Sequence, residues 1–240
     1  MTRITTGMAL AAGLGTRMRP LTNDRPKALV EVGGKVLLDH ALDRFAAAGV
    51  SRAVVNIHHF ADLMRAHIEA RTGAPDIVIS DETGELLETG GGMVKALPLL
   101  GDDPVLVSNI DAVWVDQGRP ELARLMEAWD ESQVDVLLLL APMENTLGFD
   151  GAGDFFLEAD GCLDWRGDRP SAPYAYAGAH IVHPRVFAGE TVRRFSLTEI
   201  WKRLSTEGRL HGLPMEAFWM HVGDPRARDE AEARLASGMM

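Results

Sequence analysis

Apolar segments of two kinds alternate along the first 140 residues of the chain. Short runs such as 53–57 and 134–141 have the length and composition of buried strands. Between such runs, segments such as 37–45 and 61–71 repeat their apolar residues at helical spacing. Because consecutive βα units place their strands side by side and in one direction, this order predicts a parallel sheet with helices on both faces.

After residue 142 the pattern changes to short strand-like segments joined by turns. Segments 154–158 and 162–165 flank Ala159-Asp160-Gly161, a sequence typical of a hairpin turn. The stretch Ser196-Leu197-Thr198-Glu199 matches a capping box, so we expect a helix to follow it. Asp224-Pro225 combines a cap residue with proline at the first helical position and predicts a last helix. The second half therefore adds antiparallel structure to the core.

Length and composition are those of a globular protein. The 240 residues, of which 46% are hydrophobic, suit a single domain. We expect residues 1–140 to form the core and 141–240 to form a lid-like part. The single cysteine, Cys162, excludes an internal disulfide framework. No apolar run reaches 18 residues and the first six lack a signal-peptide pattern, so we expect no membrane-spanning helix and a cytoplasmic location.

The charge of the chain is unevenly distributed. The formal net charge is −11, which argues against nucleic acid and anionic membranes as partners. Residues 1–35 nevertheless contain six basic and two acidic side chains, a local charge of +4. A cationic segment on an acidic protein predicts one local anion-binding site.

The segment 10–27 has the features of a phosphate-binding loop. Small residues follow the first predicted strand, so the backbone can approach a ligand and direct its N–H groups at phosphate oxygens. Basic residues behind them supply positive charge. A Walker A loop is excluded because its Gly-Lys-Ser/Thr ending is absent, and Met18 stands where a dinucleotide fingerprint needs a third glycine. The small residues are Ala11, Ala12, Gly13 and Gly15, and the basic ones are Arg17 and Lys27.

This segment, continued through residue 38, resembles the opening motif of the sugar-1-phosphate nucleotidyltransferases. Residues 87–101, Asn109-Ile110-Asp111 and 176–184 resemble further blocks of that family, so the resemblance covers nearly the whole chain. The compact length and the 87–92 block are most similar to the N-acetylmuramate-1-phosphate uridylyltransferase subgroup. The fold that this resemblance implies is α/β: a Rossmann-like mixed, mostly parallel sheet with helices on both faces and an antiparallel sugar-binding extension.

The resemblance also implies a reaction. A nucleotidyl group would pass from an NTP, expected to be UTP, to a sugar 1-phosphate, expected to be N-acetylmuramate 1-phosphate, with release of pyrophosphate. A guanylyltransferase that acts on mannose or heptose 1-phosphate is an alternative, and so is a nucleotide-sugar binding or regulatory protein without turnover. The expected partners are these small molecules, and a monomer and a small homo-oligomer both fit.

The same resemblance assigns roles to single residues. Arg17, Lys27 and Asp111 would be catalytic, and Asp111 would also hold Mg²⁺, with Mn²⁺ as the alternative. The expected nucleotide contacts are Ala11, Ala12, Gly13, Gly15, Thr16, Arg17, Lys27, Thr89, Gly90, Gly91 and Asn109. The expected sugar contacts are Gly153, Asp154, Glu158 and Gly178.

The chain departs from the family pattern near its end. Many relatives carry Trp-x-Asp-x-Gly-Thr there, and that Asp is a second metal ligand, whereas this chain reads Trp219-Met-His221-Val-Gly-Asp224. Three interpretations stay open. His221 binds an ion softer than Mg²⁺, Asp224 replaces the missing carboxylate, or Asp111 and the substrate phosphates hold the ion without a second carboxylate. Asp224 also fits a helix N-cap.

Overall fold

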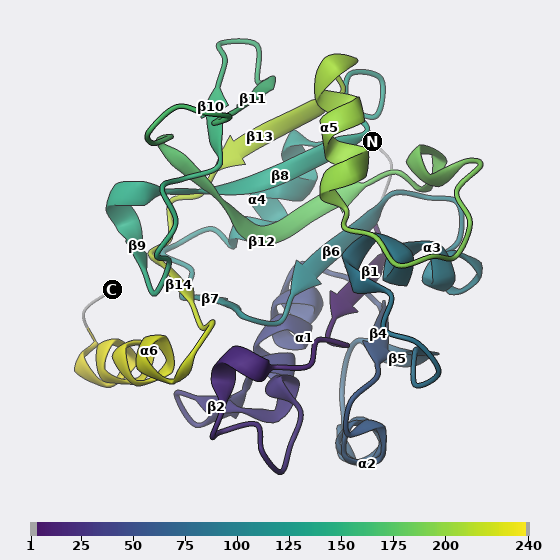
Figure 1. Cartoon of the computed structure of the whole chain (residues 1–240), viewed down its shortest axis with the longest axis vertical. Helices are drawn as coiled ribbons and strands as arrows, with labels where there is room; N and C mark the ends of the chain where they lie inside the picture. Colours follow the sequence, from purple (N-terminus) through teal and green to yellow (C-terminus); the bar gives the residue numbers. More distant parts are fainter. Residues whose placement is uncertain (1–3, 239–240) are drawn as a thin grey trace.

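The computed structural model describes residues 4–238, and its core is a nine-stranded mixed sheet (Figure 1). Met1–Arg3, including one of the six basic residues of the N-terminal segment, lie outside the described residues. Within residues 4–238, no helix has the length and apolar character needed to cross a membrane. The strands of the sheet are β1 (Thr6–Leu10), β4 (Arg52–Ile57), β5 (Asp76–Asp81), β6 (Val105–Asn109), β8 (Val136–Pro142), β10 (Phe155–Leu157), β11 (Leu163–Trp165), β12 (Tyr174–Val182) and β13 (Leu210–Pro214).

Helices and smaller strands surround this sheet. The α-helices are α1 (Leu37–Ala47), α2 (Ala61–Ala70), α3 (Glu88–Leu100), α4 (Glu121–Ala128), α5 (Thr198–Thr206) and α6 (Pro225–Ser237). The short 3₁₀ turns are η1 (Thr16–Met18), η2 (Lys27–Leu29), η3 (Met143–Asn145) and η4 (Pro184–Phe187). A two-stranded sheet joins β2 (Glu31–Val32) and β3 (Lys35–Val36), and a three-stranded sheet joins β7 (Ala112–Trp114), β14 (Trp219–His221) and β9 (Thr146–Leu147).

The order of the parallel strands positions the site. β5, β4, β1 and β6 lie side by side in that order, and each pairs in parallel with its neighbours. The chain therefore moves from β1 to β4 and β5 on one side and then returns to β6 on the other side of β1. In open α/β sheets, a crevice opens at the carboxyl ends of the strands where the order reverses. That point lies at the ends of β1, β4 and β6.

The antiparallel extension begins at β12, which pairs with β6. β8 and β10 both pair with β12, and β13 pairs in parallel with β8, so the second half of the chain widens the sheet (Figure 1). The hairpin of β10 and β11 forms around Ala159-Asp160-Gly161 as predicted, with the Glu158 N–H donating to the Cys162 carbonyl. The predicted α/β fold with an antiparallel extension is confirmed.

Two hydrophobic cores lie on opposite faces of the sheet. Neighbouring residues of one strand point to opposite faces, so in β1 Ala9 packs with α1 and Met8 packs with α3. The first core includes residues of α1, α2 and α4, and the second includes residues of α3 and α5. Helices therefore cover both faces, as the alternation of segments predicts.

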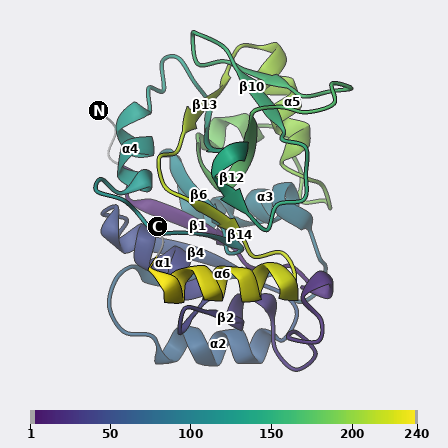
Figure 2. The same ribbon diagram turned by 90° about the vertical axis from the view of Figure 1, so that its left-hand side faces the viewer.

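The last helix, α6, lies against the two small sheets rather than the main one (Figure 2). The Asp224 side chain accepts a 2.9 Å hydrogen bond from the Ala227 N–H and caps the helix. Gly238 ends the helix in the left-handed conformation at φ 65°. The predicted Asp224-Pro225 helix start is confirmed.

The helix predicted after Ser196 is present, but its predicted capping box does not form. α5 begins at Thr198, and the Glu199 carboxylate pairs with Arg193. Thr89 lies inside α3, and its hydroxyl oxygen accepts from the Leu197 N–H at 2.9 Å. This contact joins the first turn of α3 to the start of α5.

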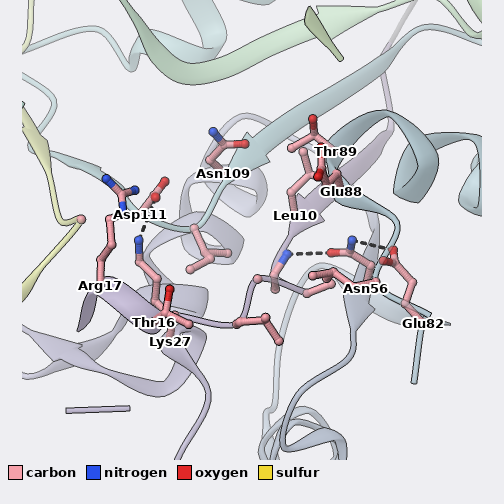
Figure 3. Close-up of a pocket in the computed structure, with 18 of the residues that line it drawn as sticks. Leu10, Thr16, Arg17, Lys27, Asn56, Glu82, Glu88, Thr89, Asn109 and Asp111 are labelled. Atoms are coloured by element: carbon pink, nitrogen blue, oxygen red, sulfur yellow. Dashed lines mark hydrogen bonds and ion pairs between the residues drawn. The ribbon is translucent and has the colours of Figure 1, made fainter. Parts of the chain in front are cut away.

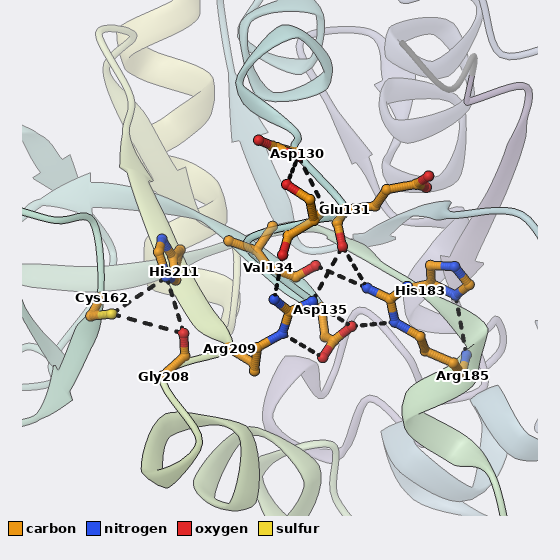
Figure 4. Close-up of polar contacts among 11 residues, drawn as sticks. Asp130, Glu131, Val134, Asp135, Cys162, His183, Arg185, Gly208, Arg209 and His211 are labelled. Carbon is orange, nitrogen blue, oxygen red and sulfur yellow. Dashed lines mark hydrogen bonds and ion pairs between the residues drawn. The ribbon is translucent and has the colours of Figure 1, made fainter.

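Asp135 joins three parts of the extension through paired arginines (Figure 4). Its carboxylate accepts from Arg185 and, at 2.9 Å, from Arg209. Burial raises the pKa of Asp135, but these hydrogen bonds outweigh it and lower the pKa below the ordinary 3.8. The stabilisation is therefore present above pH 3.8 and is lost as the pH falls through the lowered pKa.

Asp135→Asn is expected to lower the free energy of unfolding at pH 7 by about 2 kcal/mol, because the charge-assisted hydrogen bonds to the carboxylate are lost. The pair with Arg185 contributes little of this, because the Arg185 side chain is partly exposed. Urea unfolding at pH 7 and pH 3 measures this. The difference between the wild type and the variant should shrink at pH 3, and an equal difference at both values would contradict the assignment.

Candidate active site

A cavity of about 450 Å³ opens at the carboxyl ends of β1, β4 and β6 (Figure 3). This volume lies in the range of small-ligand sites. Ten of the predicted nucleotide and catalytic residues line it: Ala11, Ala12, Gly13, Gly15, Thr16, Arg17, Lys27, Thr89, Asn109 and Asp111. The other lining residues are Leu10, Leu14, Asn56, Glu82, Leu86, Glu88, Ile110, Ser196 and Gly223.

The loop after β1 folds back so that two of its four basic residues converge on one end of the cavity. Gly15 has φ 64°, in the left-handed region, and its carbonyl accepts a 2.8 Å hydrogen bond from the Thr22 hydroxyl. A Cβ at position 15 would lie 3.0 Å from the Lys27 Cβ, so glycine permits the close approach of the two loop segments. Arg17 and Lys27 both face this end, beside Asp111 (Figure 3).

A buried ion pair forms the cationic end of the cavity. The Lys27 Nζ donates to the Asp111 Oδ2 at 2.8 Å, with only 11% of the lysine side chain exposed. Burial raises the pKa of Asp111, but the charge of Lys27 and the interaction with His221 outweigh it and lower the pKa far below the ordinary value of 3.8. The His221 Nε2 lies 3.6 Å from the same oxygen. A charged carboxylate is therefore fixed between two nitrogen-bearing side chains.

The opposite end of the cavity is a chain of buried hydrogen bonds (Figure 3). The Ala11 N–H donates to the Asn56 Oδ1 at 2.6 Å, and the Asn56 Nδ2 donates to the Glu82 Oε1 at 2.7 Å. Glu82 is fully buried, and its Oε2 has no hydrogen-bond partner within residues 4–238. Burial raises the pKa of Glu82 above the ordinary 4.5. This end of the cavity is therefore lined by polar groups that are almost fully buried.

Sequence reasoning missed Glu82. It follows β5 directly, in the same way that Asp111 closely follows β6, and its N–H donates to the Ile57 carbonyl at the end of β4. A polar residue directly after a core strand could therefore have marked Glu82 as a candidate site residue. The position of Glu82 in the cavity depends on the order of the strands, which places β5 next to β4.

Two predicted nucleotide contacts lie behind the cavity wall. Gly90 and Gly91 are buried in the first turn of α3, and both N–H groups donate to the Phe195 carbonyl, at 2.9 and 3.3 Å. A Cβ on Gly91 would lie 2.0 Å from the Arg193 carbonyl oxygen. The structure thus uses both glycines to pack α3 against the segment before α5, and neither lines the cavity.

The four predicted sugar contacts also lie outside the cavity lining. The Gly153 carbonyl accepts from Arg166, and the Asp154 Oδ2 accepts from the Tyr176 N–H at 2.9 Å. Glu158 lies in the exposed β10–β11 turn. Gly178 is nearer, since a Cβ there would lie 2.6 Å from the Ala112 Cβ, next to Asp111.

The donor chemistry around Asp111 fits a divalent cation. A carboxylate oxygen and an imidazole nitrogen are both metal ligands. Within residues 4–238, no third His, Cys, Asp or Glu completes a cluster with them, so further ligands would come from the substrate. Asp224 caps α6 and lines a separate hollow of about 60 Å³.

This arrangement suits a ligand that is anionic at one end and carries hydrogen-bonding atoms at the other. Arg17 and Lys27 place basic groups at one end of the cavity, and Gly13–Gly15 line it without bulky side chains beside the backbone, features that suit phosphate oxygens. Since phosphoryl and nucleotidyl transfer depend on positioning and charge neutralisation, no side-chain nucleophile is needed.

Comparisons with known proteins agree with this chemistry. The profile of the MobA-like NTP transferase domain matches residues 7–193. The N-acetylmuramate alpha-1-phosphate uridylyltransferase of Caulobacter vibrioides is 54% identical over 232 residues, which cover 95% of this chain and 96% of that protein. A mannose-1-phosphate guanyltransferase of Aspergillus fumigatus is 30% identical over 91% of this chain and 61% of its own length.

The fold has solved counterparts. The crystal structure of a UDP-glucose pyrophosphorylase complexed with UDP-glucose superposes with a TM-score of 0.79 at 16% identity, covering 98% of this chain and all of that one. At that identity the likeness concerns the fold alone. With the profile match and the 54% identical relative, the chain belongs to the sugar-1-phosphate nucleotidyltransferases with a MobA-like NTP transferase domain.

Proposed function

We propose that the chain transfers a uridylyl group from UTP to N-acetylmuramate 1-phosphate and releases pyrophosphate. The observation that carries this proposal is the 54% identity to the Caulobacter uridylyltransferase, which extends over 96% of that protein and includes no large unmatched part. The cavity supports it, because a cationic end and a buried polar end suit the triphosphate and the base of one nucleotide.

In this reaction an oxygen of the sugar phosphate attacks the α-phosphorus of UTP. A new P–O bond forms as the bond between the α-phosphorus and its bridging oxygen breaks, and the electron pair leaves with pyrophosphate. Lys27 would neutralise charge at the α-phosphate, and Arg17 would stabilise the leaving pyrophosphate. Asp111 would hold a divalent ion, Mg²⁺ or Mn²⁺, that offsets further phosphate charge when bound.

The base would lie at the end formed by Asn56 and Glu82, because the cations occupy the other end. The Glu82 Oε2 would form a hydrogen bond with the edge of the uracil ring. Glu82→Gln keeps a hydrogen-bonding atom at that position and should leave the KM for UTP within about threefold, whereas Glu82→Leu removes it and should raise KM about tenfold, the equivalent of one hydrogen bond.

Steady-state kinetics with UTP measures this pair of variants. In both variants the Asn56 Oδ1 stays available to the Ala11 N–H, although Glu82→Leu also removes the acceptor of the Asn56 Nδ2. If Glu82→Gln raised the KM for UTP as much as Glu82→Leu does, the negative charge of Glu82 would be required for binding.

The sugar would bind next to Asp111 and Gly178. The contacts of Gly153, Asp154 and Glu158 with the sugar remain predictions. We further propose that residues 1–140 and 141–240 act within one domain, the first holding the nucleotide and the second closing over the sugar. The proposed partners are the two small-molecule substrates, taken up in the cytoplasm by a monomer or small homo-oligomer.

The decisive experiment measures pyrophosphate release with UTP, GTP, CTP and ATP, each combined with the 1-phosphates of N-acetylmuramate, mannose and a heptose. The proposal expects release with UTP and N-acetylmuramate 1-phosphate at least tenfold faster than with any other pair. Release only with GTP and mannose or heptose 1-phosphate would assign the chain to the guanylyltransferases. Binding of UTP without release with any divalent ion would identify a binding protein.

A further inference from the structure

His221 faces Asp111 across a gap that is too wide for a hydrogen bond. Its Nε2 lies 3.6 Å from the Asp111 Oδ2, and about a fifth of each side chain is exposed. Hydrogen bonds between nitrogen and oxygen rarely exceed 3.2 Å. The two side chains therefore lie at the distance of an ion pair rather than of a short hydrogen bond.

The other ring nitrogen determines what faces the gap. The His221 Nδ1 lies 3.2 Å from the Gly148 carbonyl oxygen, and a carbonyl only accepts, so Nδ1 carries the proton. Nε2 is then the ring nitrogen that faces the Asp111 carboxylate. Histidines that bind metals commonly donate their second ring N–H to a backbone carbonyl in this way.

The surroundings hold the ring in this orientation. It stacks on Trp219 with the ring centroids 5.7 Å apart, and Phe149 meets it edge-on at 6.0 Å. Gly148, at φ 73°, places its carbonyl beside the ring nitrogen Nδ1, and a Cβ on Gly223 would lie 2.7 Å from the His221 Cε1. Small residues on both sides thus make room for an imidazole that is fixed before any ligand arrives.

We infer that His221 Nε2 and Asp111 ligate one divalent ion of the Mn²⁺ type, with nitrogen taking the place of a second carboxylate. Two atoms that each lie about 2.0–2.2 Å from one ion can be 3.6 Å apart. Imidazole favours first-row transition ions, whereas Mg²⁺ prefers oxygen. The inference rests on the proposed function for the phosphate oxygens that would complete the coordination.

Pulsed electron paramagnetic resonance of bound Mn²⁺ tests this directly. The full chain is loaded with Mn²⁺, alone and with UTP, and the ¹⁴N modulation from a coordinated imidazole is recorded. We expect the modulation in the wild type, its loss in His221→Asp, and its persistence in His211→Gln, a matched control on β13. Wild type without modulation, or modulation that survives His221→Asp, would overturn the inference.

The preference between ions supplies a second readout. Competition titrations should show that His221→Asp lowers the ratio of Mn²⁺ to Mg²⁺ affinity by about tenfold or more, because an oxygen ligand replaces nitrogen. An unchanged ratio in a variant that keeps the wild-type circular dichroism would also overturn the inference.

The experiments can disprove the role of His221 and the proposed function independently of each other. An enzyme that makes the UDP-sugar but shows no ¹⁴N modulation disproves the role of His221 and leaves the proposed function intact. Modulation without any product supports the ion site and disproves the proposed substrates.

Discussion

Asp111→Asn is expected to lower kcat for pyrophosphate release by about 10³-fold. The substitution keeps the shape of the side chain but removes the charge that would hold a divalent ion and that pairs with Lys27 at 2.8 Å. Loss of one preorganised charge contact to the reacting phosphates typically costs 10²–10³-fold, and the loss of the ion adds to this. Single-turnover and steady-state assays with saturating substrates measure the effect, with UTP binding followed by calorimetry.

Asp224→Asn is the matched control. Asparagine caps helices about as well as aspartate, so α6 should stay intact and kcat should stay within about twofold. If Asp224→Asn lost as much activity as Asp111→Asn, Asp224 would be a metal ligand despite its place in a separate hollow. If the wild type turned over and Asp111→Asn did so at the same rate, Asp111 would have no part in the chemistry.

The local pattern of residues was sufficient for the core of the fold. Apolar residues spaced for strands and helices predicted the units from β1 to β8, because burial against a neighbour on each side selects that spacing. The loop after β1 and Asp111 were equally visible, since glycines followed by basic residues and a carboxylate after an apolar strand have few purely structural uses. These residues do converge on one cavity.

The rest depended on contacts between distant segments. Glu82 lines the cavity beside Asn56, which lies 26 residues away in the chain. Thr89, Gly90 and Gly91 have the composition of a nucleotide turn, yet the Phe195 segment, which no local pattern places there, occupies the N–H groups of both glycines. The Asp154 carboxylate likewise accepts a hydrogen bond from a distant segment, the Tyr176 N–H of β12.

The same limitation explains His221. The sequence showed that a histidine stands where many relatives carry an aspartate that binds metal. How this histidine is oriented depends on its hydrogen bond to Gly148, which lies 73 residues earlier. That contact sets the orientation of the ring, and therefore which ring nitrogen faces Asp111.

Lys27→Met is expected to affect activity and stability together. The variant loses the ammonium proposed to act at the α-phosphate, which should lower kcat by about 10²–10³-fold. It also leaves the Asp111 carboxylate, 22% exposed, without its nearest cation. Removing one partner of a buried ion pair typically lowers the free energy of unfolding by about 3 kcal/mol or more. Urea unfolding and pyrophosphate release, measured on the same preparation, report the two effects.

The double variant Lys27→Met/Asp111→Asn separates these effects. Both members of the pair become neutral, so no uncompensated charge remains buried, and most of the lost stability should return. Activity should stay as low as in the less active of the two single variants, because neither the cation nor the carboxylate is restored. If activity recovered with stability, the losses in the single variants would reflect misfolding, and the pair would be structural. Recovery of stability alone means that the chain retains a costly buried charge pair for its chemistry.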